Sequence, residues 1–161
     1  MVIKEIKEKN NFNINKNNVS EKEQVLEIAK KDIIAFGQLF MPEDFMKSTP
    51  APYHYELSDL LLDDTKKRNC IILPRGHSKS TLAKAALMYH LYFNPEGKKE
   101  FIAWVAEEQS QAIDHIKYIQ NHIEMNPALN YYFGDLQGSK WTEKEFTTSK
   151  GDRVIAKGTS Q

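Results

Sequence analysis

A short polar segment, residues 74–81, carries the side chains whose types and spacing could do chemistry. Its sequence is Pro-Arg-Gly-His-Ser-Lys-Ser-Thr, and it follows an apolar run at residues 70–73. A helical pattern starts directly after it, with four residues on one apolar face: Leu82, Ala85, Ala86 and Tyr89. A strand, then a loop of small residues, then Lys-Ser-Thr at the start of a helix is typical of a phosphate-binding loop, or P-loop.

The chemistry of phosphate binding explains this order of residues. Free backbone N–H groups and the positive end of the helix dipole converge on such a loop and bind anions. In this interpretation Lys79 reaches the β- and γ-phosphates of a triphosphate, and the hydroxyl of Ser80 binds Mg²⁺. Gly76 lets the backbone approach the phosphates closely. The sequence therefore predicts a site for ATP and Mg²⁺, bound by the whole loop: Pro74, Arg75, Gly76, His77, Ser78, Lys79, Ser80 and Thr81.

The loop matches the Walker A pattern, G-x-x-x-x-G-K-[ST], only in part. Ser78 stands at the second glycine position and Leu73 at the first. The simpler alternative is that Lys-Ser-Thr begins an ordinary helix after a strand, and these eight residues do not decide between the two. The strand pattern before the loop and the apolar helix after it favour the nucleotide site.

The segments before the loop divide into a tail and a folded part. Residues 1–19 are rich in asparagine and lysine, and we expect a disordered tail because they offer little apolar surface to bury. Residues 20–161 then form the folded part. Ser20 and Glu23 have the spacing of a capping box, and the apolar stripe after them predicts one helix that ends at Pro42.

The remaining elements follow from local patterns. We expect a helix over residues 54–62 and a second buried strand over residues 101–106. A long helix follows over residues 110–125, and a β-hairpin pairs residues 146–148 with 154–156. The alternation of strands and helices predicts an α/β fold with a parallel sheet flanked by helices.

The composition excludes several classes of protein. The 161 residues include 22 basic and 22 acidic side chains, so the net charge gives no overall case for nucleic-acid binding. One cysteine, Cys70, excludes a disulfide framework and a cysteine-based zinc site, and we expect it to be a small core residue. No apolar run approaches the ~20 residues of a membrane span, and the N-terminus lacks a signal-peptide pattern. The expected compartment is the reducing cytoplasm.

The order of motifs over about residues 24–161 resembles the large terminase subunit of tailed bacteriophages, a DNA-packaging motor. Residues 74–81 look like the deviant Walker A loop of that family, which carries an arginine where Arg75 stands. Upstream, Tyr53 and His54 stand where the family has an aromatic or apolar residue followed by glutamine or histidine. Three downstream stretches are also similar: residues 104–112, the Asn-Pro and aromatic-glycine connector at 126–134, and the C-terminal hairpin.

This resemblance implies a function and a set of partners. The family hydrolyses ATP to move double-stranded DNA into a procapsid. It implies that Lys79 and Arg75 are catalytic, Arg75 touching the nucleotide and supporting hydrolysis, and that Tyr53 and His54 lie near adenine. The implied partners are double-stranded phage DNA, the terminase small subunit, the portal of the procapsid and further copies of the chain in a ring. The implied location is the bacterial host cytoplasm, with no membrane.

Later motifs of that family have no counterpart in this sequence. They are an arginine-glycine pair, a Walker B strand ending in Asp-Glu, a coupling motif and a metal-dependent nuclease domain. Residues 60–64 have Walker B letters, but they precede the loop and carry helical spacing; Asp135 follows a connector rather than a strand. The resemblance therefore implies a partial P-loop NTPase fold, truncated before the Walker B strand, that we do not expect to be catalytic alone.

The missing part also has a consequence for stability. In the family, as the resemblance implies, other strands lie between the Walker A strand and the next strand along the chain. Without them the backbone N–H and C=O groups of residues 70–73 have no partner strand. Unpaired backbone groups cost free energy when they are buried, and an exposed unpaired strand promotes aggregation. We therefore expect the chain to be marginally stable.

Two other interpretations stay open. The chain could be part of a helicase-type P-loop translocase, which a downstream Walker B of the form Asp-Glu-Ala-Asp or Asp-Glu-x-His would favour. It could instead be a non-catalytic protein, either a prophage remnant or an interaction module derived from the motor. A remnant would show no Lys79-dependent binding of ATP.

Overall fold

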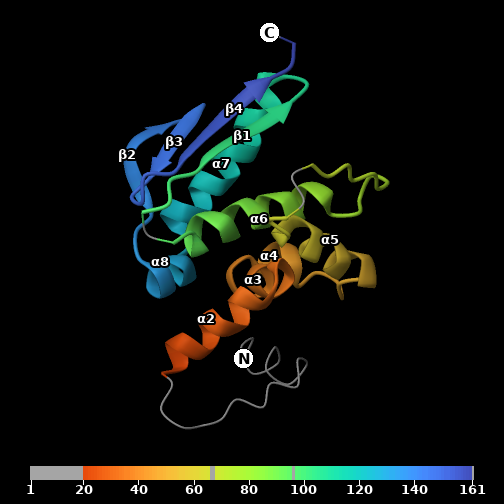
Figure 1. Cartoon of the computed structure of the whole chain (residues 1–161), viewed down its shortest axis with the longest axis vertical. Coiled ribbons are helices and arrows are strands. Elements are labelled where there is room, and N and C mark those ends of the chain that lie inside the picture. Colours follow the sequence, from red (N-terminus) through yellow and green to blue (C-terminus); the bar gives the residue numbers. More distant parts are fainter. Residues whose placement is uncertain (1–19, 66–67, 96, 161) are drawn as a thin grey trace. The chain divides into compact units, whose positions relative to one another are not determined.

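The computed structural model describes residues 20–65, 68–95 and 97–160. They divide into two compact units, one up to Tyr89 and the other from His90 onward. Figure 1 labels the helices and strands of both. No helix within the described ranges is long and apolar enough to cross a membrane. The tail predicted for residues 1–19 lies outside the described residues.

The first unit is built from helices. In order these are α2 (Glu21–Lys31), α3 (Ile33–Phe40), α4 (Pro42–Phe45), α5 (Pro52–Leu62) and most of α6 (Lys79–Phe93) (Figure 1). The stripe of apolar residues predicted from the sequence forms its core. The ring of Phe36, at its centre, lies 5.1 Å from the ring of Phe40 and 5.8 Å from that of Tyr89. Aromatic rings at these separations pack favourably beyond their buried area.

The N-terminal helix is shorter than the sequence predicted. Its capping box is confirmed, because Ser20 and Glu23 satisfy each other's backbone N–H groups. The single helix to Pro42 is wrong, however, since the helix ends at Asp32. Asp32 has an extended backbone and its carboxylate accepts a hydrogen bond from the N–H of Ala35, at 2.6 Å. An aspartate that caps a following helix in this way ends the preceding one.

Two hydrogen bonds fix the helices that carry the loop and the segment before it. The hydroxyl of Ser58, fully buried on α5, accepts from the N–H of Ile33 at 2.9 Å. The hydroxyl of Tyr89 on α6 donates to the carbonyl of Lys30 at 2.9 Å. Both α5 and α6 are therefore attached to the pair α2 and α3, and this attachment positions the N-terminal ends of α5 and α6.

Residues 70–73 are not the buried strand that the sequence predicted. They have no regular structure, Ile72 is 87% exposed, and Cys70 is exposed rather than in the core. No backbone–backbone hydrogen bond between described residues involves this segment. A strand needs a neighbour to accept and donate its ladder of hydrogen bonds. The described part of the first unit contains no other strand, so an apolar run of strand length stays unpaired.

The second unit is α/β and holds a four-stranded sheet. Its elements after α6 are β1 (Phe101–Ala106), α7 (Gln109–Met125), α8 (Pro127–Phe133), β2 (Gln137–Thr142), β3 (Glu145–Thr148) and β4 (Arg153–Gly158). The strand order is β1-β4-β3-β2, with β1 and β4 parallel and the other pairs antiparallel. The predicted hairpin is confirmed as β3 and β4. The sheet is mixed rather than parallel, because this hairpin and β2 join it.

One face of this sheet is covered and the other is open. Helix α7 lies along β1 and β4 (Figure 1) and buries Ile116 and Ile119 completely. The outward side chains of β1 stay accessible: Phe101 is 62% exposed and Val105 is 53% exposed. The strand predicted at residues 101–106 is therefore confirmed, at the edge of the sheet. Its predicted burial is wrong, because its side chains alternate between exposed and half-buried.

The turn between β3 and β4 is held by a buried carboxylate. Asp152 is fully buried, and its Oδ1 accepts from the side-chain amide of Asn94 at 2.8 Å and from the N–H of Glu100 at 3.0 Å. Its Oδ2 accepts from the hydroxyl of Thr148 at 2.8 Å. Asn94 follows the end of α6 and Glu100 precedes β1, so one side chain joins three segments. Removing it would leave buried donors without an acceptor.

The replacement Asp152→Ala tests this network. We expect the free energy of unfolding of the second unit to fall by about 2–4 kcal/mol, because two buried donors and one part-buried donor lose their acceptor. Urea unfolding followed by tryptophan fluorescence measures the change, since Trp104 and Trp141 both lie in this unit. The control Asp114→Ala removes an exposed carboxylate from α7 and should change the stability by less than about 0.5 kcal/mol. Equal stability of the two variants would contradict the network.

The unpaired segment makes a prediction for the whole chain. Residues 70–73 expose apolar surface that folding does not bury, and the two units are separate compact bodies. We therefore expect calorimetry to show no single cooperative transition in the range of about 45–65 °C that is common for mesophile domains. One sharp transition in that range, with equal calorimetric and van't Hoff enthalpies, would contradict the prediction.

Candidate nucleotide site

The predicted loop makes a sharp turn between residues 70–73 and α6. Two of its residues have left-handed backbone conformations, Gly76 with φ of +80° and Ser78 with φ of +56°. Ser78 is the only non-glycine residue with a positive φ among those described, and it stands at the second glycine position of the Walker A pattern. Glycine adopts this left-handed conformation freely, whereas serine adopts it at a cost in free energy. This difference explains why the Walker A pattern has glycine at that position.

Three N–H groups at the start of α6 have no acceptor. The carbonyl of Ser78 accepts the first helical hydrogen bond, from the N–H of Leu82 at 2.9 Å. The N–H groups of Lys79, Ser80 and Thr81 make no hydrogen bond to any other described residue. They point out of the positive end of the helix dipole, where an anion is stabilised. The loop therefore presents a cradle suited to a phosphate group.

Two cations belong to the same loop. The Nζ of Lys79 donates to the carbonyl of Pro74 at 2.8 Å and also to that of Leu73, so it folds back across the start of the loop. An ammonium group has three N–H donors, so one is left for an anion, which is a stronger partner than a carbonyl. Arg75 is exposed and its guanidinium has no partner among the described side chains.

The structure brings Tyr53 and His54 to the loop. Both lie in the first turn of α5, and the ring of Tyr53 is 4.1 Å from that of His54 and 5.9 Å from that of His77. His77 is in turn 3.1 Å from the carbonyl of Arg75, measured from its Nδ1. Residues more than twenty positions apart in the sequence therefore form one cluster of rings beside the phosphate cradle.

The ring of His54 has one satisfied nitrogen and one without a partner. Its Nδ1 accepts a hydrogen bond from the N–H of Ala51 at 2.9 Å, so the neutral ring carries its proton on Nε2. That Nε2 is shut off from solvent and has no partner within the described part of the chain. His54, Ser78 and Thr81 line a small pocket of about 40 Å³, room for roughly one water molecule. The pocket therefore offers an unpaired donor beside the loop.

Among the described carboxylates, that of Asp44 on α4 lines the small pocket beside the loop, together with Ser78 and Thr81. Residues 60–64 lie on the last turn of α5 and just after it, not on a strand, as their spacing predicted. Asp135 belongs to the second unit, where its carboxylate accepts from the N–H of Gln137 at 2.8 Å. Within the described residues, no three or more His, Cys, Asp or Glu side chains gather where they could hold a metal ion.

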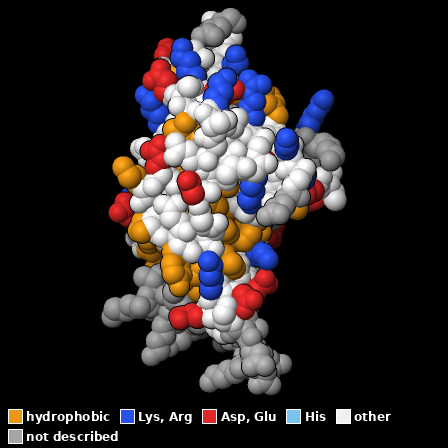
Figure 2. All heavy atoms as spheres, turned by 90° about the vertical axis from the view of Figure 1, so that its left-hand side faces the viewer, with side chains coloured by type: hydrophobic (Ala, Val, Ile, Leu, Met, Phe, Trp, Pro, Cys, Tyr) orange, Lys and Arg blue, Asp and Glu red, His pale blue; other side chains and the backbone are white. Residues whose placement is uncertain are grey.

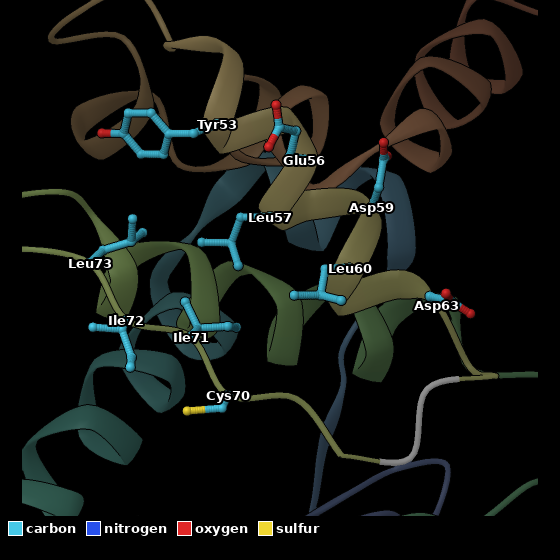
Figure 3. A pocket seen from close by; sticks show the side chains of 10 residues that line it. All are labelled: Tyr53, Glu56, Leu57, Asp59, Leu60, Asp63, Cys70, Ile71, Ile72 and Leu73. Atoms are coloured by element: carbon cyan, nitrogen blue, oxygen red, sulfur yellow. The ribbon is translucent and has the colours of Figure 1, made fainter.

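A second hollow, next to the loop, was missed from the sequence. It lies between α5 and residues 70–73 and has a volume of about 550 Å³. Figure 3 shows Leu57 and Leu60 pointing from α5 toward residues 70–73, while Glu56 and Asp59 point away from that segment. The signal in the sequence is the apolar run at residues 70–73, whose pattern predicts a sheet strand.

Comparison of the sequence with models of known protein families and with curated proteins gave no match. We therefore infer the function of the loop from its geometry and from the resemblance of the sequence motifs to those of the terminase family.

The protonation of His54 gives a prediction for pH. Burial, and secondly the charge of the neighbouring His77, lower the pKa of His54 below its ordinary value of about 6.5. As the pH falls below that value, the unfolded chain binds a proton at His54 that the folded chain does not. The folded state therefore loses stability as the pH falls through this range.

An NMR titration of the imidazole Cε1–H signals checks this prediction. We expect His54 to titrate below the ordinary pKa of histidine, and the replacement His77→Asn to raise its pKa only part of the way, because burial is the larger cause. A pKa for His54 at or above the ordinary value would show that its ring is not enclosed as described.

Proposed function

We propose that residues 74–81 bind the phosphates of ATP, and that the chain is the ATP-binding part of a phage terminase large subunit. In this proposal the fold is a P-loop NTPase fold cut before its Walker B strand, and the intact motor packages double-stranded DNA into procapsids. The observation that carries the nucleotide site is the set of three free N–H groups at the start of α6, next to Lys79. The order of motifs along the sequence supports the terminase assignment.

Each residue of the site has a role in this proposal. The N–H groups of Lys79, Ser80 and Thr81 hold the phosphates, and Lys79 moves from the loop carbonyls to the β- and γ-phosphates. Ser80, whose hydroxyl is exposed, would hold Mg²⁺, which neutralises phosphate charge when it is bound. Arg75 adds a second cation at the mouth of the loop.

The base of the nucleotide has a candidate site beside these residues. Tyr53 offers an aromatic face, and His54 offers an Nε2–H donor that has no partner within the described structure. The pocket at His54 is too small for a purine. A base would therefore lie against the ring of Tyr53, and it would accept a hydrogen bond from the Nε2–H of His54 once a neighbouring side chain moves aside. An unpaired buried donor is costly, and an acceptor on the base would remove that cost.

The chain by itself should bind MgATP without hydrolysing it. Hydrolysis needs a carboxylate to hold Mg²⁺ and another group to orient the attacking water. Among the described residues, Asp44 lines the pocket beside Ser78 and Thr81, but no three or more His, Cys, Asp or Glu side chains gather there to hold a metal ion. In the intact family, the later motifs supply these groups. Assembly with the small subunit, the portal and further copies of the chain in a ring is part of the proposal.

A calorimetric titration of the full chain with MgATP tests this function. We expect weak binding, with a Kd on the order of 1 mM, and at least a roughly tenfold weaker Kd for Lys79→Ala. Ser80→Ala should remove the dependence on Mg²⁺ while leaving the backbone cradle intact. The control Lys22→Ala, which removes an exposed lysine in the first turn of α2, should bind like the wild type.

Two results would count against the proposal. Equal heats from the wild type and from Lys79→Ala would remove the nucleotide site and favour the non-catalytic remnant. ATP turnover by the purified chain that Lys79→Ala abolishes would contradict the claim that it is not catalytic alone.

A further inference from the structure

The Nε2–H of His54 is a donor that the described structure leaves without an acceptor. The N–H of Ala51 donates to Nδ1 of the same ring at 2.9 Å, which places the proton of the neutral imidazole on Nε2. That nitrogen is shut off from solvent and has no hydrogen-bond partner within the described part of the chain. Because a buried donor without an acceptor costs free energy, an acceptor is expected beside it.

The small pocket at His54 has the size and the lining that a buried water needs. Its volume of about 40 Å³ has room for roughly one water molecule. Four other lining residues have side chains that bear oxygen: Asp44, Ser48, Ser78 and Thr81. A buried water takes two to four polar partners, whereas a cavity with an apolar lining stays dry. The pocket therefore has the chemistry of a water site.

Asp44 is the lining residue best suited to accept from such a water. It has the only carboxylate among the described residues that line the pocket, and hydrogen bonds to a carboxylate are stronger than those to the hydroxyls of Ser48 and Thr81. Its ion pair with Lys47, at 3.9 Å, leaves capacity on its two oxygens. Burial lowers the pKa of Lys84 on α6, and the negative charge of Asp44 acts against that lowering.

The short helix α4 holds Asp44 at the pocket. Next to it in the chain, Phe45 is buried and packs on Gly37 of α3, where a Cβ atom would lie 2.5 Å from the ring. The carbonyl of Met41 accepts from the N–H of Asp44 at 3.0 Å and from that of Phe45 at 3.1 Å. The backbone of α4 is therefore fixed to α3, and the side chain of Asp44 is 29% exposed.

We propose that one ordered water molecule occupies this pocket, accepts the Nε2–H of His54 and donates to the carboxylate of Asp44. Asp44 is then a positioning residue for the ring of His54, and the second hydrogen of the water is left for a hydroxyl of the lining. The bridge joins α4 to the first turn of α5, beside the start of α6. It goes beyond the proposed function and does not rest on it. A base that takes the Nε2–H of His54 would do so by displacing this water.

The charged groups on the surface of the second unit differ from the donor in this pocket. In Figure 2, blue basic side chains gather at the end where β4 lies in Figure 1. Two of them have a partner, because Glu145 forms ion pairs with Lys140, at 2.7 Å, and with Arg153, at 2.6 Å. Hydrogen bonds from Arg153 and then from Lys140 lower the pKa of Glu145. Those cations are partnered within the chain, whereas the donor of His54 needs a further molecule.

The first test uses the nucleotide-free full chain, labelled with ¹⁵N, and the water itself as the probe. We expect the Nε2–H proton of His54 to be visible at neutral pH, because it is shut off from solvent. A rotating-frame Overhauser spectrum should show a cross-peak between this proton and water, with the sign of a direct contact rather than of chemical exchange. This measurement needs no variant, so it does not depend on whether a variant folds.

The second test removes the charge of Asp44 and leaves its shape. In Asp44→Asn we expect the Nε2–H of His54 to exchange with solvent roughly tenfold faster or more, because a neutral acceptor holds the water less firmly. The pKa of His54 should fall further below its ordinary value, since the carboxylate no longer favours the imidazolium. The matched control Glu43→Gln, on the exposed side of α4, should change neither. Lys47 and Lys84, which face Asp44, stay in place in both variants.

Three results would overturn the proposal. The first is a visible Nε2–H proton of His54 that has no direct contact with water. The second is equal exchange and an equal pKa of His54 in Asp44→Asn and Glu43→Gln, which would make a hydroxyl the acceptor. The third is a rise in the pKa of His54 in Asp44→Asn. Because none of these measurements involves ATP, a failure here is distinguishable from a failure of the nucleotide site.

Discussion

The candidate site depends on one constraint: the first three N–H groups of α6 have no acceptor in the described structure. A helix can begin in this way only where solvent or an anion satisfies those groups. The left-handed turns at Gly76 and Ser78 aim the chain into the helix, and the bonds from Lys79 to two loop carbonyls hold the turn closed. In the proposed site, the same lysine would serve both the shape of the loop and its affinity for phosphate.

The first unit combines a well-packed helical core with an unfinished strand. The core around Phe36 fixes α5 and α6, and through them the rings of Tyr53 and His54 beside the loop. Residues 70–73, which lead into that loop, have no such support. A loop whose entry is unpaired has no sheet to position it.

Sequence reasoning succeeded where structure is set locally. The capping box at Ser20, the helix after the loop and the hairpin of β3 and β4 all follow from side chains within a few residues of one another. It failed where the outcome depends on distant partners. The apolar run at residues 70–73 has the pattern of a strand, but a strand forms only against a neighbour. The pattern of residues 126–134 predicts a connector, whereas the structure has helix α8 there, capped by the side chain of Asn126, which accepts from two N–H groups.

The most direct test of the account is an amide NMR titration of the full chain with MgATP. The account predicts that the amide signals of Lys79, Ser80 and Thr81 shift most and that those of Tyr53 and His54 follow, while the amides of the sheet in the second unit stay in place. Shifts confined to other residues, or none at concentrations well above 1 mM, would show that the free N–H groups of α6 do not bind a nucleotide.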